Sequence, residues 1–155
     1  MSSKNLFDLS GLVAVVTGGN GGIGRGIALG MAQAGAAVAI IARNDEKNQR
    51  VISELEALGV PALALKTDLA DRSQLPSALG KVEKKLGPIN ILVNNAGIAV
   101  RGGVLELDPT DWDRVFEINV NASFLLSKIA ARSMIQQGRG KIINIASEQI
   151  GRAHV

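Results

Sequence analysis

Cysteine is absent from the 155-residue sequence, and histidine occurs once, at His154. The chain can therefore form neither a disulfide nor a thiolate metal site, and a single histidine excludes any site that needs two. Aromatic residues make up only 3% of the sequence, and the formal net charge is +3. So few rings and so small a charge argue against a nucleic-acid partner.

Long apolar runs are also absent. No run approaches the length of a membrane span, and the first ten residues, MSSKNLFDLS, lack the apolar stretch of a signal peptide. We therefore expect no membrane partner and a cytoplasmic protein. Apolar residues make up 46% and charged residues 20% of the sequence, which favours one folded domain with a buried core.

Five short apolar stretches rich in valine, isoleucine and alanine recur along the chain. They are Leu12–Val16, Ala37–Ile41, Ala62–Leu65, Ile89–Val93 and Ile142–Ala146. Continuous apolar runs of this length are typical of strands buried on both faces of a parallel sheet. Segments with helical periodicity lie between them, so the order of elements predicts an α/β fold with a doubly wound parallel sheet.

The helical segments carry end signals. Asn44 or Asp45 would cap the second helix, and Gly59 follows its end. The last helix is the longest, from about Asp111 to Gln137, and Thr110 with Asp113 forms a capping-box pattern at its start. Apolar residues share one face of the second and third helices: Val51, Leu55 and Leu58, then Leu75, Leu79, Val82 and Leu86.

The stretch TGGNGGIG, residues 17–24, lies between the first strand and the first helix. Free N–H groups and the positive dipole end at a helix N-terminus bind phosphate, and glycines let the backbone approach it. The stretch fits G-x-G-x-x-G from residue 19 and T-G-x-x-x-G-I-G from residue 17. A tight strand–helix turn without a ligand is the alternative. We expect a dinucleotide to contact Gly18, Asn20, Gly22, Ile23 and Gly24.

Polar groups also follow the later strands, where ligands of such folds bind. Asp68-Leu69 follows the third strand, Asn94–Gly97 the fourth and Ser147 the fifth, while Asn119 lies in the long helix. Each has a simpler interpretation by itself: a turn cap, a loop brace or a solvated side chain. Their common position at the carboxyl edge of the sheet favours a functional site.

In combination, Thr17–Gly24, Asn94–Gly97, Asn119 and the stretch IINIAS resemble the short-chain dehydrogenase/reductase family along the whole chain. The resemblance implies a single Rossmann-type dinucleotide-binding domain over residues 1–155. It also implies hydride transfer between a nicotinamide cofactor and an alcohol or ketone. By this resemblance Asp68 binds the adenine amino group. The resemblance adds further cofactor contacts from Leu69, Asn95, Ala96 and Gly97.

The same resemblance assigns Asn119 and Ser147 to the family's catalytic Asn-Ser-Tyr-Lys set. The serine hydroxyl would polarise the substrate oxygen, where negative charge develops. The family's proton donor is a tyrosine with a lowered pKa, and this sequence contains no tyrosine. We therefore expect the N-terminal part of a longer enzyme, lacking the family's C-terminal strands and helices and inactive by itself. The alternative is a naturally truncated protein that binds dinucleotide or a partner without catalysis.

The cofactor preference depends on the end of the second strand. An NAD enzyme of this fold carries an acid about 20 residues past the glycines. Here Ala42 stands at that position and Arg43 follows, which favours the 2′-phosphate of NADP(H) over NAD(H). Against this, NADP-dependent members often carry a basic residue where this chain has Gly21, and a solvated Arg43 is the simpler interpretation.

The resemblance identifies the substrate and the partners less specifically than the cofactor. The stretches FDLSGLVAVVTGG and GKIINIAS resemble bacterial members acting on sugars or sugar acids, and almost as much 3-oxoacyl-carrier-protein reductases. Residues 98–107 are expected to form a loop at the site mouth, where Arg101 is either solvated or placed to meet an anionic substrate. Because the family's long helix packs against its copy, we expect a homo-oligomer formed through Asp111 to Gln137.

Overall fold

The computed structural model describes residues 6–103 and 105–146. Within them, five strands form one sheet with the order β3-β2-β1-β4-β5, and all four pairings are parallel. This confirms the predicted α/β fold with its doubly wound parallel sheet. The strands are β1 (Val13–Thr17), β2 (Ala37–Ala42), β3 (Ala62–Lys66), β4 (Ile91–Asn94) and β5 (Lys141–Asn144).

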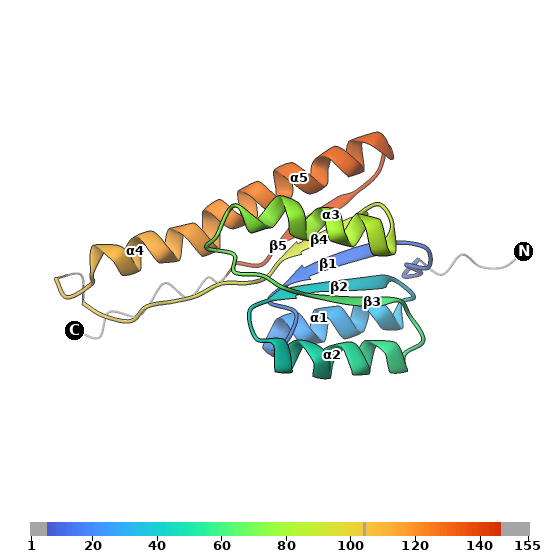
Figure 1. The fold of residues 1–155 in the computed structure, drawn as a ribbon, viewed down its shortest axis with the longest axis horizontal. Coiled ribbons are helices and arrows are strands. Elements are labelled where there is room, and N and C mark those ends of the chain that lie inside the picture. Colours follow the sequence, from blue (N-terminus) through green and yellow to red (C-terminus); the bar gives the residue numbers. More distant parts are fainter. Residues whose placement is uncertain (1–5, 104, 147–155) are drawn as a thin grey trace, which may run out of the picture.

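Helices cover both faces of the sheet (Figure 1). On one face lie α1 (Gly22–Gln33) and α2 (Asp45–Ala57), and on the other lie α3 (Gln74–Leu86) and α5 (Ala122–Gln136). Successive side chains of β1 point to opposite faces, so Val15 packs in the core under α3 and α5, and Val16 packs in the core under α1 and α2. The central strands are therefore buried on both sides.

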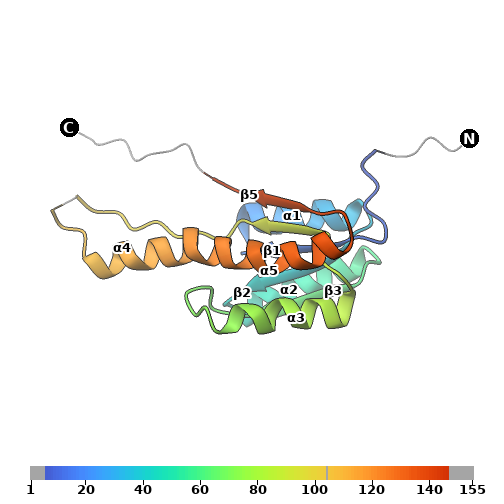
Figure 2. The ribbon, with the colours of Figure 1, turned by 90° about the horizontal axis from the view of Figure 1, so that it is seen from above.

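The outer strands differ from the expected burial on both faces. β3 is only half-buried, and all four residues of β5 are exposed. In the described part of the chain β5 pairs with β4 alone and forms an edge of the sheet (Figure 2). β5 also ends at Asn144 and not at Ala146. An edge strand buries less because one side lacks a neighbour, whatever its composition.

The long helix begins earlier than predicted, and the predicted capping box of Thr110 and Asp113 is wrong. Its first segment is α4 (Pro109–Phe116), and the N-cap is Asp108, whose Oδ1 accepts a hydrogen bond of 2.8 Å from the Thr110 N–H. Proline at the first helical position fits this start, because its ring presets the helical φ. A π-helical turn, η1 (Glu117–Asn121), then separates α4 from α5. Figure 1 shows α4 extending beyond the sheet.

The other helix signals are confirmed with one exception. Asn44 caps α2, its Oδ1 accepting from the Lys47 N–H at 2.8 Å, and Gly59 follows the helix with a φ of 79°. Leu55 is buried, but Leu58, which was predicted on the same apolar face, is 40% exposed. No helix in the described ranges combines the length and apolarity needed to cross a membrane.

Candidate functional site

The glycine stretch turns the chain sharply from β1 into α1. Gly18 and Gly22 have φ values of 66° and 49°, a region that side chains rarely tolerate. A Cβ on Gly24 would lie 2.3 Å from the Gly18 carbonyl oxygen. Gly21, in contrast, is extended and has open space around it. A Cβ on Gly19 would lie 2.6 Å from Ile40 Cγ2. The geometry therefore requires all three glycines of the T-G-x-x-x-G-I-G pattern, whereas in G-x-G-x-x-G it requires Gly19 and Gly24 and not Gly21.

The end of α1 nearest this turn offers free backbone donors. The first intrahelical hydrogen bond runs from the Arg25 N–H to the Gly21 carbonyl. The N–H groups of Gly22, Ile23 and Gly24 precede it and have no partner within the helix. Gly22 and Ile23 are exposed at this helix start, while Gly24 is buried behind the loop. Such a terminus is chemically suited to an anion.

Thr17 joins the end of β1 to the turn after β4. Its buried hydroxyl accepts from the N–H groups of Asn95 and Ala96, both at 3.0 Å. The Asn95 Nδ2 in turn donates to the Thr17 carbonyl at 2.9 Å. In the sequence, Thr17 is marked only as the first residue of the T-G-x-x-x-G-I-G motif. Its hydrogen bonds fix the Asn-Asn-Ala-Gly turn directly beside the glycine loop.

Asn94 connects its strand with two neighbouring elements. It is 4% exposed, and its Nδ2 donates to Asn144 Oδ1 at 2.8 Å and to Ser127 Oγ at 3.0 Å. These bonds connect β4 with β5 and α5. Of the two asparagines in the turn, Asn94 therefore stabilises the sheet, and Asn95 lies at the site.

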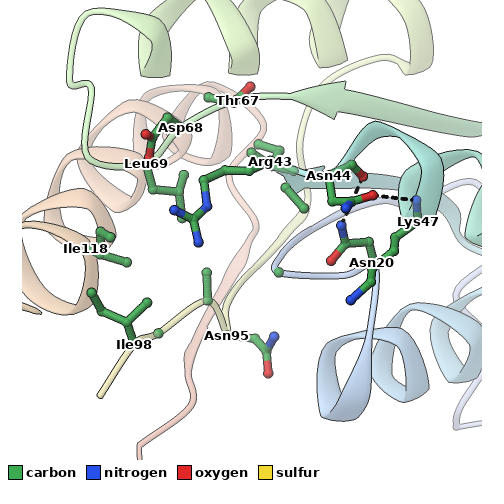
Figure 3. A pocket seen from close by; sticks show the side chains of 15 residues that line it. Asn20, Arg43, Asn44, Lys47, Thr67, Asp68, Leu69, Asn95, Ile98 and Ile118 are labelled. Atoms are coloured by element: carbon green, nitrogen blue, oxygen red, sulfur yellow. Dashed lines mark hydrogen bonds between the residues drawn. The ribbon is translucent and has the colours of Figure 1, made fainter. Parts of the chain in front are cut away.

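A cleft of about 600 Å³ opens at the carboxyl ends of the strands, where β1 has β2 on one side and β4 on the other. This is the switch point at which open α/β sheets bind ligands. Eight of the predicted cofactor contacts meet there (Figure 3). They are Gly18, Asn20, Arg43, Asp68, Leu69, Asn95, Ala96 and Gly97. The cleft lining also includes Lys47, Thr67, Ile98 and Ile118, which the sequence analysis did not identify as site residues.

The cleft lining includes two cations. Arg43 directly follows β2, and Lys47 lies one helical turn further on in α2. Within the described residues neither side chain forms an ion pair. Ala42, where an NAD enzyme would carry its acid, also lines the cleft. The sequence signal for Lys47 was its position four residues after Arg43 at the start of a helix, because residues four apart lie on the same side of a helix.

Asn119 lies beside the cleft, in η1. Its Oδ1 accepts from the Ile98 N–H, and its Nδ2 donates to the Ile98 carbonyl, both at 2.9 Å. Both hydrogen bonds hold the backbone that leaves the Asn-Asn-Ala-Gly turn. Arg101 is exposed, and among the described residues 98–103 only Ile98 lines the cleft. Ser147 lies outside the described residues.

An ion pair connects η1 with the loop after β3. The Arg72 guanidinium donates through Nε and Nη2 to the two carboxylate oxygens of Glu117. The Asn121 amide donates to Glu117 at 2.9 Å. The Arg72 hydrogen bonds, with help from Asn121, lower the pKa of Glu117 to about 2. The pair therefore ties the loop that follows Asp68 to the turn that carries Asn119.

The comparisons with known proteins agree with this geometry. The profile of a family described as short chain dehydrogenase matches residues 12–154. Gluconate 5-dehydrogenase of Gluconobacter oxydans (strain 621H) is 43% identical over 149 residues, 96% of this chain and 58% of that protein. The 2-dehydro-3-deoxy-D-gluconate 5-dehydrogenase of Escherichia coli (strain K12) is 44% identical over 142 residues, 91% of this chain and 55% of that protein.

A solved structure is similar as well. A gluconate 5-dehydrogenase from Burkholderia cenocepacia J2315, crystallised in complex with NADP and tartrate, superposes with a TM-score of 0.85 at 40% identity. The match covers 92% of this chain and 56% of that chain. This sequence thus spans little more than half the length of these three proteins.

Proposed function

Because this chain belongs to the short-chain dehydrogenase family, we propose that the full-length protein transfers a hydride between NADP(H) and an alcohol or ketone group of a sugar acid. The observation that carries the proposal is the cleft at the switch point, in which the glycine loop, Arg43, Asp68 and the Asn-Asn-Ala-Gly turn meet. The names of the relatives, gluconate and 2-dehydro-3-deoxy-D-gluconate 5-dehydrogenases, favour sugar acids over 3-oxoacyl thioesters.

The residues present fit a dinucleotide. The pyrophosphate would lie against the free N–H groups of Gly22 and Ile23 at the exposed start of α1. Gly24 lets this helix start pack closely against the Gly18 carbonyl, which an added Cβ would prevent. Arg43 and Lys47 supply the two positive charges that a 2′-phosphate requires. Lys47 therefore takes the place of the basic residue that the sequence lacks at Gly21. Asp68 and Leu69, which line the same cleft, would contact the adenine.

The catalytic assignment rests on two residues of this chain. We assign Asn119 to positioning, because its paired hydrogen bonds hold the Ile98 backbone at the cleft. We assign Ser147 to the polarisation of the substrate oxygen. When bound, the nicotinamide supplies the hydride acceptor or donor. A tyrosine and a lysine would be sought in the full-length sequence as the proton donor and its partner.

We also propose that the full-length protein is a homo-oligomer formed through the long helix. Four large apolar side chains at intervals of four residues stay exposed on it: Trp112, Phe116, Val120 and Phe124. The rings of Trp112 and Phe116 lie 4.7 Å apart, and the other two side chains follow in η1 and α5. Exposed large apolar side chains that recur along one helix are typical of a protein interface, and pairing with the same helix of a second copy would cover them.

The test is turnover by the purified full-length protein. NADPH absorbance is followed with 5-keto-D-gluconate and with a 3-oxoacyl thioester, and NADP⁺ reduction is followed with gluconate. We expect turnover of the sugar acids with NADP(H) and little with the thioester. No turnover in either direction with either cofactor, in a protein that contains Tyr-x-x-x-Lys, would contradict the proposal. Dinucleotide binding without turnover would support the second candidate, a non-catalytic binding protein.

A further inference from the structure

Asn48 is a fully buried polar residue in α2, directly behind the cleft. Its Nδ2 donates to the carbonyl of Ala42, the last residue of β2, at 3.2 Å. Its Oδ1 accepts from the Nδ2 of Asn20, in the glycine stretch, at 2.9 Å. One side chain therefore connects the end of β2 with the glycine loop. Burying an amide is costly unless its groups are paired, so this position is held by its hydrogen bonds and not by packing alone.

The hydrogen bonds to Asn20 determine which of its atoms can meet a ligand. A side-chain amide has two N–H donors and one carbonyl oxygen. One Asn20 proton goes to Asn48 Oδ1. The other goes to the Asn44 carbonyl at 3.3 Å (Figure 3). Within the described residues only the acceptor oxygen of Asn20 remains without a partner, and Asn20 lines the cleft. An acceptor pairs with a hydroxyl group and repels a phosphate oxygen.

We infer that Asn48 is a positioning residue of the cleft, which orients Asn20 so that its oxygen accepts a hydrogen bond from a ribose hydroxyl of the bound dinucleotide. This inference rests on the proposed function. An apolar residue at position 48 would fill the same volume. It would also release the Asn20 amide, which could then rotate and lose the acceptor that the ribose requires. The orientation is thus set before the ligand binds, and the ligand does not bear the entropy cost of fixing it.

The test uses Asn48→Leu in the full-length protein, with Asn90→Leu as the matched control. Asn90 is also a buried asparagine: its Oδ1 accepts from the Val13 N–H at 2.8 Å, and its Nδ2 donates to Gln137 at 2.7 Å. It precedes β4 and so lies at the amino end of the strands, away from the cleft. We expect Asn48→Leu to raise KM for NADP(H) about tenfold with kcat unchanged. Asn90→Leu should lower the melting temperature without changing KM.

A second variant keeps the inference testable if Asn48→Leu folds poorly. Asn20→Ala removes the oriented oxygen itself and should raise KM for NADP(H) to a similar extent. Adding Asn48→Leu to that background should change KM no further, because Asn48 acts through Asn20. An unchanged KM in Asn20→Ala, or additive effects in the double variant, would overturn the inference.

An NMR measurement without cofactor separates the inference from the proposed function. The two Asn20 side-chain protons should exchange slowly with solvent in the wild type and in Asn90→Leu, and rapidly in Asn48→Leu. Equal exchange in all three would show that Asn48 does not hold Asn20. A wild-type protein with slow exchange that binds neither dinucleotide would refute the proposed function and the ribose contact together. It would leave Asn48 with a purely structural role.

Discussion

Alanine at position 24 would test whether the glycine loop is built for close approach. A Cβ there would lie 2.3 Å from the Gly18 carbonyl oxygen and 2.4 Å from the Asn95 Nδ2. Both distances are about 1 Å shorter than an ordinary contact. The first neighbour is backbone, and the second is held by its bond to the Thr17 carbonyl. Neither can move without separating α1 from the loop or breaking the link between β1 and β4.

Two effects of opposite sign decide the free energy of unfolding of Gly24→Ala. Replacing a helical glycine by alanine stabilises by about 0.5–1 kcal/mol through the lost freedom of the unfolded chain. Overpacking a tight contact costs about 1–3 kcal/mol. We therefore expect a net destabilisation of about 1 kcal/mol, the difference between the centres of the two ranges. Because the helix start must shift, NADP(H) binding should weaken by more than tenfold.

Gly26→Ala is the control, because it lies in the same helix and its added Cβ meets nothing within 4 Å. This variant should gain about 0.5–1 kcal/mol and bind NADP(H) like the wild type. Urea unfolding and calorimetric titration of the full-length variants measure both quantities. If Gly24→Ala were as stable as Gly26→Ala, or bound cofactor as tightly as the wild type, the close-approach argument would be refuted.

Three further predictions concern charge and the exposed helix. Arg43→Asp should reverse the preference from NADP(H) to NAD(H), since a carboxylate repels a 2′-phosphate and accepts from a 2′-hydroxyl; Lys47→Ala should weaken NADP(H) binding about tenfold and spare NAD(H). Unchanged kcat/KM with both cofactors would contradict this. Glu117→Gln removes the ion pair with Arg72. Since the pKa of Glu117 falls from 4.5 to about 2 on folding, its stabilisation is present above pH 4.5 and lost as the pH falls to 2. The melting temperature of wild type should exceed that of the variant at neutral pH and converge with it near pH 2. Phe124→Asp should reduce the assembly size in sedimentation; an unchanged size would contradict pairing through this helix.

The sheet was predictable because two sequence signals identify its central strands: a continuous apolar run, and turn or capping residues at both ends of the run. The run that becomes β2 is wholly apolar, and turn or capping residues such as Gly35 and Asn44 bound it on both sides. The burial of the outer strands was not predictable from such runs. Ile142 and Ile143 are as apolar as the residues of β1, yet they are 38% and 41% exposed. Exposure depends on the neighbouring strands and helices, which composition does not specify.

The cleft residues that directly follow strands were predictable from the sequence. Asp68 and Asn95 follow strands closely, and the carboxyl ends of parallel strands meet at one edge. Asn48 was within reach of the same kind of reasoning, because it lies three residues before Val51 and seven before Leu55 and so shares the buried face of α2. Its hydrogen-bond partners were not predictable, because the Ala42 carbonyl and the Asn20 side chain come from other parts of the chain.

The long helix depends on a local distortion that periodicity does not reveal. In a regular α-helix, residues four apart drift by about 40° per step, so Trp112 and Phe124 would diverge by about 120°. The wider turn of η1 reduces this drift, and both side chains, with Phe116 and Val120 between them, remain exposed. The same turn directs Asn119 to the Ile98 backbone. The proposed oligomer interface and the proposed catalytic asparagine therefore share one structural cause. A substitution that restored regular α-helix over Glu117–Asn121 should impair both together.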